Sequence, residues 1–145
     1  MNVEIINTAF RLNIYGFSGI ALNKDYAATA FRLSGKMWDI VKANNLKNKG
    51  INVWVYEPNE MVFAGVELDN VPENDIVLEQ KDIVLSKYAY YKHVGPYTLI
   101  KQIGRNMQNE LNSKGLETGP LYIEIYGHWT SDETKAETEL LISLK

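Results

Sequence analysis

The sequence contains no cysteine among its 145 residues, which excludes disulfide bonds, thiolate metal sites and a cysteine nucleophile. It also lacks an apolar run near the roughly 18–20 residues that a membrane-spanning helix requires. Its first residues, MNVE, lack the basic and apolar stretches of an export signal. We therefore expect a soluble cytoplasmic protein that makes no contact with a membrane.

The sequence also has no excess of positive charge. Fifteen Lys and Arg residues stand against eighteen Asp and Glu residues, which leaves a formal net charge of −3. A mildly acidic chain has little general attraction for a phosphate backbone, so we expect no direct nucleic-acid contact of the electrostatic kind. Hydrophobic residues make up 46% and charged residues 23% of the chain, values typical of one globular domain at this length.

The first half of the chain predicts the order strand, helix, strand, strand. β-Branched and aromatic residues over 4–21 indicate a strand that runs into a turn, and residues 25–44 have a helical period. Two short strands are predicted over 51–56 and 61–68. We expect the helix to pack through apolar positions three or four residues apart, namely Ala27, Ala30, Phe31, Ser34, Met37, Trp38 and Val41.

The second half repeats this order. A strand over 82–94 precedes a helix that begins at Pro96 and ends near Gly115. Strands over 121–126 and 137–144 follow, with a polar turn between them. The repetition predicts a duplication about a pseudo-two-fold axis, which creates a cleft between the two halves.

We therefore predict an α+β fold built from a tandem βαββ repeat with a central cleft. The first half covers residues 1–70, a linker covers 71–81, and the second half covers 82–145 of one domain. Aligned on each other, the halves match residues 17–19 with 93–95 and residues 53–56 with 123–126.

Alternation along the strands predicts which side chains share the cleft. Successive residues of a strand point to opposite faces, so Val53 and Val55 are expected to face the helix, while Trp54 faces away. In the second half the apolar set is Leu121, Ile123 and Ile125. The remaining set meets at the cleft and consists of Trp54, Tyr56, Tyr122, Glu124 and Tyr126.

A carboxylate among aromatic rings suits a ligand that is flat, apolar and cationic. Each well-placed ring contributes about 0.5–2 kcal/mol of cation–π attraction, and Glu124 supplies the counter-charge. Because an unpaired buried carboxylate is costly, we expect the empty site to supply a tyrosine hydroxyl donor or to shift the acid toward its protonated form. The alternative is that Glu124 is a solvated strand residue and the tyrosines are cross-strand packing pairs.

Several short motifs follow one another in a characteristic order and spacing. They are residues 50–56 (GINVWVY), 63–68 (FAGVEL), 90–97 (YYKHVGPY), 119–126 (GPLYIEIY) and 137–142 (ETELLI). Together they resemble the GyrI-like effector-binding domain, and the first half is closest to the integron-cassette-associated branch. The resemblance covers nearly the whole chain and implies two SH2-like halves.

That family includes ligand domains of bacterial transcription activators and multidrug regulators, as well as stand-alone proteins of similar size. The resemblance implies that Glu124 lies in a central aromatic cleft and engages lipophilic cations, without a cofactor. These 145 residues leave no room for a DNA-binding domain beside the effector-binding domain, so we expect no regulation by direct DNA contact.

Two further aromatic residues are candidates for ligand contact. Tyr91 is one of them, although the strand register that decides between Tyr91 and its neighbours Tyr88 and Tyr90 is open. Trp129 lies in the polar turn at the expected cleft mouth, where it is either a lid or a cap on the core. His93 and His128 lack partners at metal spacing, so we expect no metal site.

Three functions remain open. The first is non-enzymatic binding of aromatic, cationic small molecules by a sensor or sequestering protein. The second, implied by the resemblance, is a hydrolase that opens strained cyclopropane rings of DNA-alkylating natural products, with Glu124 as general base and Tyr56, Tyr91 or Tyr126 as proton donor. The third is an inhibitor module that docks a protein, as in relatives that act on a topoisomerase. Neither the natural ligand nor a regulatory protein partner is identified by the sequence.

Overall fold

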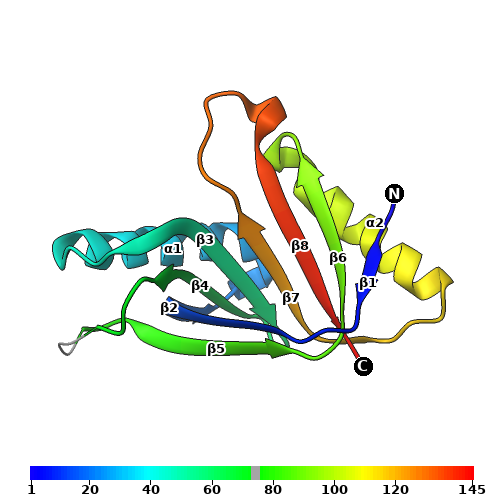
Figure 1. The fold of residues 1–145 in the computed structure, drawn as a ribbon, viewed down its shortest axis with the longest axis horizontal. Coiled ribbons are helices and arrows are strands. Elements are labelled where there is room, and N and C mark those ends of the chain that lie inside the picture. Colours follow the sequence, from blue (N-terminus) through cyan, green and yellow to red (C-terminus); the bar gives the residue numbers. More distant parts are fainter. Residues whose placement is uncertain (73–75) are drawn as a thin grey trace.

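The computed structural model describes residues 1–72 and 76–145 and shows one antiparallel sheet with two helices (Figure 1). Within these residues the elements are β1 (Glu4–Ile6), β2 (Phe10–Ile20), α1 (Tyr26–Ala43), β3 (Asn48–Glu57), β4 (Met61–Leu68), β5 (Glu79–Leu85), β6 (Tyr88–Val94), α2 (Ile100–Ser113), β7 (Thr118–Tyr126) and β8 (Glu137–Leu144). The predicted α+β class is confirmed. Neither described helix is long and apolar enough to cross a membrane.

The strand order shows that the two halves are equivalent. The sheet runs β1-β6-β8-β7-β3-β4-β2-β5, so reversing it exchanges each strand of one half with its counterpart in the other. The centre of the sheet is the β3–β7 pair, where Val53 lies opposite Ile125 and Val55 opposite Ile123. The pseudo-two-fold axis therefore passes between these two strands.

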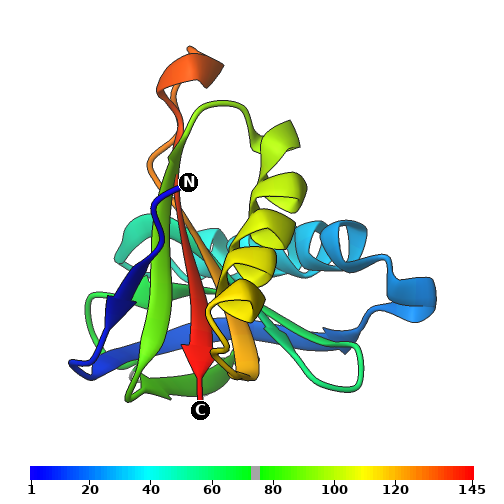
Figure 2. The same ribbon diagram turned by 90° about the vertical axis from the view of Figure 1, so that its right-hand side faces the viewer.

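Each half lends its first strand to the other half. β1 pairs with β6 (Figure 2), and β5 pairs with β2. The single strand predicted over 4–21 is therefore two strands, β1 and β2, and the one predicted over 82–94 is divided between β5 and β6. A short break after Ile6 and another after Leu85 let the chain cross between the two halves of the sheet. The expected linker over 71–81 is shorter than predicted because β5 begins at Glu79, and residues 73–75 of it lie outside the described residues.

The buried stripe of α1 is rotated from the predicted one. Its buried side chains are Thr29, Ala30, Leu33, Ser34, Met37 and Val41. Phe31, predicted to face the core, is 75% exposed, and Ala27 is exposed as well. Leu33 takes the core position because it lies three residues after Ala30, whereas Phe31 lies about 100° around the helix from Ala30.

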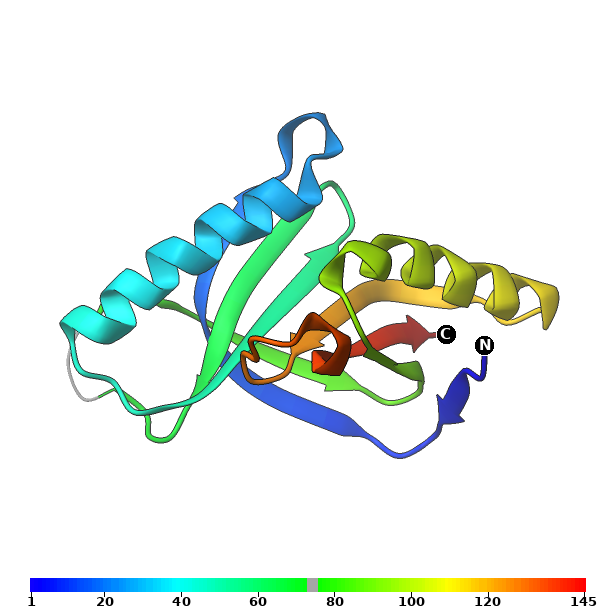
Figure 3. The same ribbon diagram turned by 90° about the horizontal axis from the view of Figure 1, so that it is seen from above.

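Both helices cover the same face of the sheet and diverge from one another, as Figure 3 shows. Val53 and Val55 do not face α1 as predicted. They are buried on the helix-free face, in a cluster to which Ile14, Phe63 and Ile83 also contribute. Strands from both halves meet in this cluster, so the curved sheet packs against itself and needs no helix there. The alternate residues, including Trp54 and Tyr56, consequently lie on the helix-bearing face.

Candidate ligand-binding site

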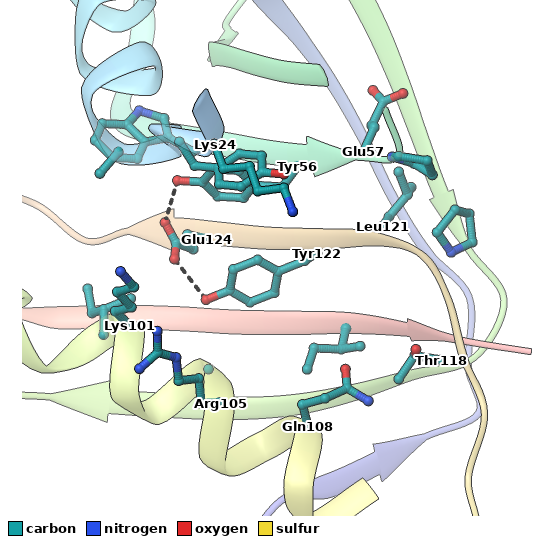
Figure 4. A pocket seen from close by; sticks show the side chains of 18 of the residues that line it. Lys24, Tyr56, Glu57, Lys101, Arg105, Gln108, Thr118, Leu121, Tyr122 and Glu124 are labelled. Atoms are coloured by element: carbon teal, nitrogen blue, oxygen red, sulfur yellow. Dashed lines mark hydrogen bonds between the residues drawn. The ribbon is translucent and has the colours of Figure 1, made fainter. Parts of the chain in front are cut away.

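A pocket of about 910 Å³ opens between the two helices, above the β3–β7 pair (Figure 4). Its walls come from the turn before α1, from β3, from α2 with the short helix Tyr97–Leu99 before it, and from β7. This volume lies within the range of about 300–1,000 Å³ that small-molecule sites occupy. The pseudo-symmetric arrangement thus leaves a cavity where the two halves meet.

Glu124 lies in this pocket and is only 6% exposed. Three tyrosine hydroxyls donate hydrogen bonds to its carboxylate. Tyr56 and Tyr126 donate to Oε1 at 3.0 and 2.7 Å, and Tyr122 donates to Oε2 at 2.7 Å. The expectation that the empty site would supply a tyrosine donor is confirmed, and the reading of Glu124 as a solvated strand residue is wrong.

The sheet register brings these residues together. Trp54 of β3 lies opposite Glu124 of β7, and Tyr56 lies opposite Tyr122. Residues opposite one another project to the same face, and Tyr126 joins them because it is two positions beyond Glu124. The Tyr56 and Tyr122 rings stack with centroids 5.5 Å apart, and the Trp54 and Tyr126 rings lie 4.8 Å apart.

Burial and charge keep the three phenols protonated. Burial raises the pKa of Tyr56, Tyr122 and Tyr126 well above the usual range of a phenol, and the adjacent negative charge of Glu124 raises each pKa further. A phenol that keeps its proton remains a hydrogen-bond donor. The three donors therefore stabilise the carboxylate without neutralising its charge.

The structure brings five of the predicted site residues into one pocket and leaves two outside it. Trp54, Tyr56, Tyr122, Glu124 and Tyr126 all line the pocket. Tyr91 packs against the core cluster that contains Met107 and does not line the pocket. Trp129 is 82% exposed in the connection between β7 and β8. Direct ligand contact stays a prediction for the five.

Sequence reasoning missed several residues of the wall. Tyr26 and Tyr97 each form a T-shaped ring contact with a site tyrosine. The ring centroids of Tyr26 and Tyr56 lie 5.9 Å apart, and those of Tyr97 and Tyr126 lie 5.7 Å apart. Lys101 and Arg105 of α2 also line the pocket. Their spacing of four residues could have identified them as a pair, because it places both side chains on one face of the helix.

We expect Tyr122→Phe to destabilise the protein more than Tyr56→Phe. The first change leaves Oε2 without a donor among the described residues, whereas the second leaves Oε1 bound to Tyr126. A hydrogen bond to a charged group contributes about 1.5–3 kcal/mol, so we expect a loss of about 2 kcal/mol for Tyr122→Phe and about 1 kcal/mol for Tyr56→Phe. Urea unfolding at pH 7 measures both, and equal losses would contradict the assignment of donors.

No protein-family model matches the sequence, and no curated protein does. The structure is similar to the C-terminal domain of EcmrR, with a TM-score of 0.76 and 15% identity over 100% of this chain and 99% of that one. The fold is that of a GyrI-like effector-binding domain. The chain spans 56% of the EcmrR chain in a DNA complex, where the TM-score is 0.68.

Other solved structures share the GyrI-like fold. SAV2435 bound to tetraphenylphosphonium matches with a TM-score of 0.69 and 15% identity, over 100% of this chain and 94% of that one. A Vibrio cholerae integron cassette protein has a TM-score of 0.59 and 14% identity, with 99% and 95% covered. A hydrolase from Listeria innocua has a TM-score of 0.59 and 12% identity, with 99% and 91% covered.

Proposed function

We propose that this protein binds aromatic, positively charged small molecules in the pocket, with Glu124 as the anchor. One observation carries the proposal. The carboxylate is buried, yet its partners are neutral phenols, and among the described residues it forms no salt bridge with a Lys, Arg or His side chain. A ligand cation would supply the missing counter-charge, and the rings around it would add cation–π attraction.

The comparisons support the same proposal. SAV2435, which shares the fold, is bound to tetraphenylphosphonium. This ligand is a lipophilic cation whose charge is carried by a phosphorus atom with four phenyl groups. A protein that holds such molecules without altering them acts as a sensor or as a sequestering protein. The acidic anchor and the aromatic walls described above are the chemistry that this role requires.

Tetraphenylphosphonium is the probe that tests the proposal. We expect Glu124→Gln to weaken its binding about tenfold to a hundredfold, because the amide removes the negative charge while keeping the shape of the side chain. Binding of the neutral triphenylphosphine oxide should change little. Isothermal titration calorimetry of both compounds with both proteins gives the comparison.

Glu139→Gln is the matched control. Glu139 also accepts a tyrosine hydroxyl, at 2.6 Å from Tyr90, but it does not line the pocket. We expect this variant to bind tetraphenylphosphonium as the wild type does. Equal affinity of wild type and Glu124→Gln would remove the carboxylate from ligand recognition.

Hydrolysis is the second candidate, and the carboxylate–phenol cluster is the observation that favours it. Glu124 would act as general base on water while Tyr56 or Tyr126 donates a proton. The raised pKa values of these phenols make them poor acids, which favours binding over catalysis. Tyr91 does not line the pocket, so we leave it out of this proposed mechanism. Mass spectrometry of a ligand recovered after incubation distinguishes binding from hydrolysis. A binding protein leaves the mass of the ligand unchanged, whereas a hydrolase adds one water.

A further inference from the structure

The α2 wall of the pocket carries two positive charges. Lys101 and Arg105 both line the cavity, and Figure 4 shows them on successive turns of α2 on the side of Glu124 and Tyr122. Both residues are exposed, which places their charged groups at the mouth of the pocket rather than at its floor. Lys24 adds a third cation on the opposite wall.

Among the residues that the structure describes, no acid forms a salt bridge with either cation of α2. Within residues 1–72 and 76–145, neither Lys101 nor Arg105 takes part in a salt bridge or a side-chain hydrogen bond. Glu57, an acid of the same pocket, is paired with Lys81. Two like charges four residues apart destabilise a helix, and the same helix ends with the opposite arrangement, in which Lys114 pairs with Glu110.

A glycine on α2 leaves space between the two cations and Glu124. Gly104 lies between Lys101 and Arg105 and also lines the pocket. A Cβ atom at this position would come within 3.2 Å of the Tyr122 hydroxyl oxygen, so a larger residue would crowd the phenol that binds Glu124. The glycine leaves one continuous space from the cationic mouth to the acidic floor.

We infer that the ligand is zwitterionic, with an aromatic body, a cation near Glu124 and an acidic group held by Lys101 and Arg105. This inference rests on the proposed function and adds the anionic group to it. A carboxylate, sulfonate or phosphate suits the guanidinium fork of Arg105, which donates two parallel hydrogen bonds. A ligand with only positive charge would leave the two cations of α2 unpaired and would be repelled by them.

Two rhodamine dyes that differ by one methyl ester test the inference. Rhodamine 110 carries a free carboxylate beside its cationic ring system, and rhodamine 123 is its methyl ester. By fluorescence anisotropy, we expect the wild type to bind the free acid about tenfold more tightly than the ester, the size of one charge-assisted contact. The double variant Lys101→Gln/Arg105→Gln should lose this preference by weakening the free acid alone.

Lys114→Gln is the matched control, since it removes a positive charge just after the end of α2 and outside the pocket. It should leave the preference for the free acid intact. Equal affinity for the two dyes, or a preference that survives the double variant, would overturn the inference. The proposed function would still stand if Glu124→Gln weakened both dyes, whereas failure of both dyes to bind would overturn the two proposals together.

Discussion

Raising the pH by one unit above pH 10.5 is expected to lower the free energy of unfolding by about 4 kcal/mol through the three phenols that surround Glu124. Tyr90, whose pKa burial also raises, adds to this loss in the wild type and in the variants alike. In the unfolded chain, phenols lose their protons near pH 10. In the folded protein, burial and then the charge of Glu124 raise the pKa of Tyr56, Tyr122 and Tyr126 far above that value. The unfolded state therefore binds fewer protons, and stability falls as the pH rises, by about 1.4 kcal/mol per pH unit for each phenol.

Urea unfolding at pH 9.5, 10.5 and 11.5 measures this slope. The Tyr122→Phe variant is the control, because it removes one of the three phenols and should reduce the slope by about 1.4 kcal/mol per pH unit. Below pH 9 the raised pKa values have no effect on the slope, since the phenols are protonated in both states. A variant with the same slope as the wild type would show that Tyr122 ionises in the folded protein.

The Gly16→Ala variant is expected to lose about 3 kcal/mol or more of stability, enough to unfold a marginal domain. Gly16 of β2 lies opposite Gly65 of β4 in the sheet beneath α1. A Cβ atom at Gly16 would overlap the Ala64 carbonyl oxygen and lie 2.6 Å from the Gly65 Cα. Because these are backbone atoms, only a separation of the two strands relieves the overlap.

Gly35→Ala is the matched control for this change. Gly35 lies within α1, and a Cβ atom there would meet no heavy atom within 4 Å. Alanine is favoured over glycine in a helix by about 1 kcal/mol, so this variant should be slightly more stable than the wild type. Urea or thermal unfolding measures the change in stability of the two variants. We expect Gly16→Ala to lose stability and Gly35→Ala to gain it, and similar changes would contradict the close approach of β2 and β4.

Much of the architecture could be predicted because it depends on local patterns. Helical periods identified both helices, and β-branched runs identified β3, β4, β7 and β8. The breaks between β1 and β2 and between β5 and β6 were missed, because each crossing is only a few residues long. Which half of the sheet receives a strand depends on pairing with distant residues, and a strand's composition does not specify its partner.

The site residues could be predicted because side chains alternate between the two faces of a strand. Alternation along the strands grouped Trp54 and Tyr56 with Glu124 correctly, since residues two apart share a face whatever lies above it. The face on which the helices lie was predicted wrongly. The helix-free face holds Val53 and Val55 in a core of its own, because the sheet curves over itself.

Residue order alone therefore established the duplicated α+β unit, the acidic residue among aromatic rings and the absence of thiol chemistry. These properties depend on composition and on contacts between residues that are near in sequence. Packing across the pseudo-two-fold axis decided the rest, namely the exchange of β1 and β5, the exclusion of Tyr91 and Trp129 from the pocket, and the cationic α2 wall. Those features join residues from separate elements, whose distances are set only when the sheet curves and the helices take their places.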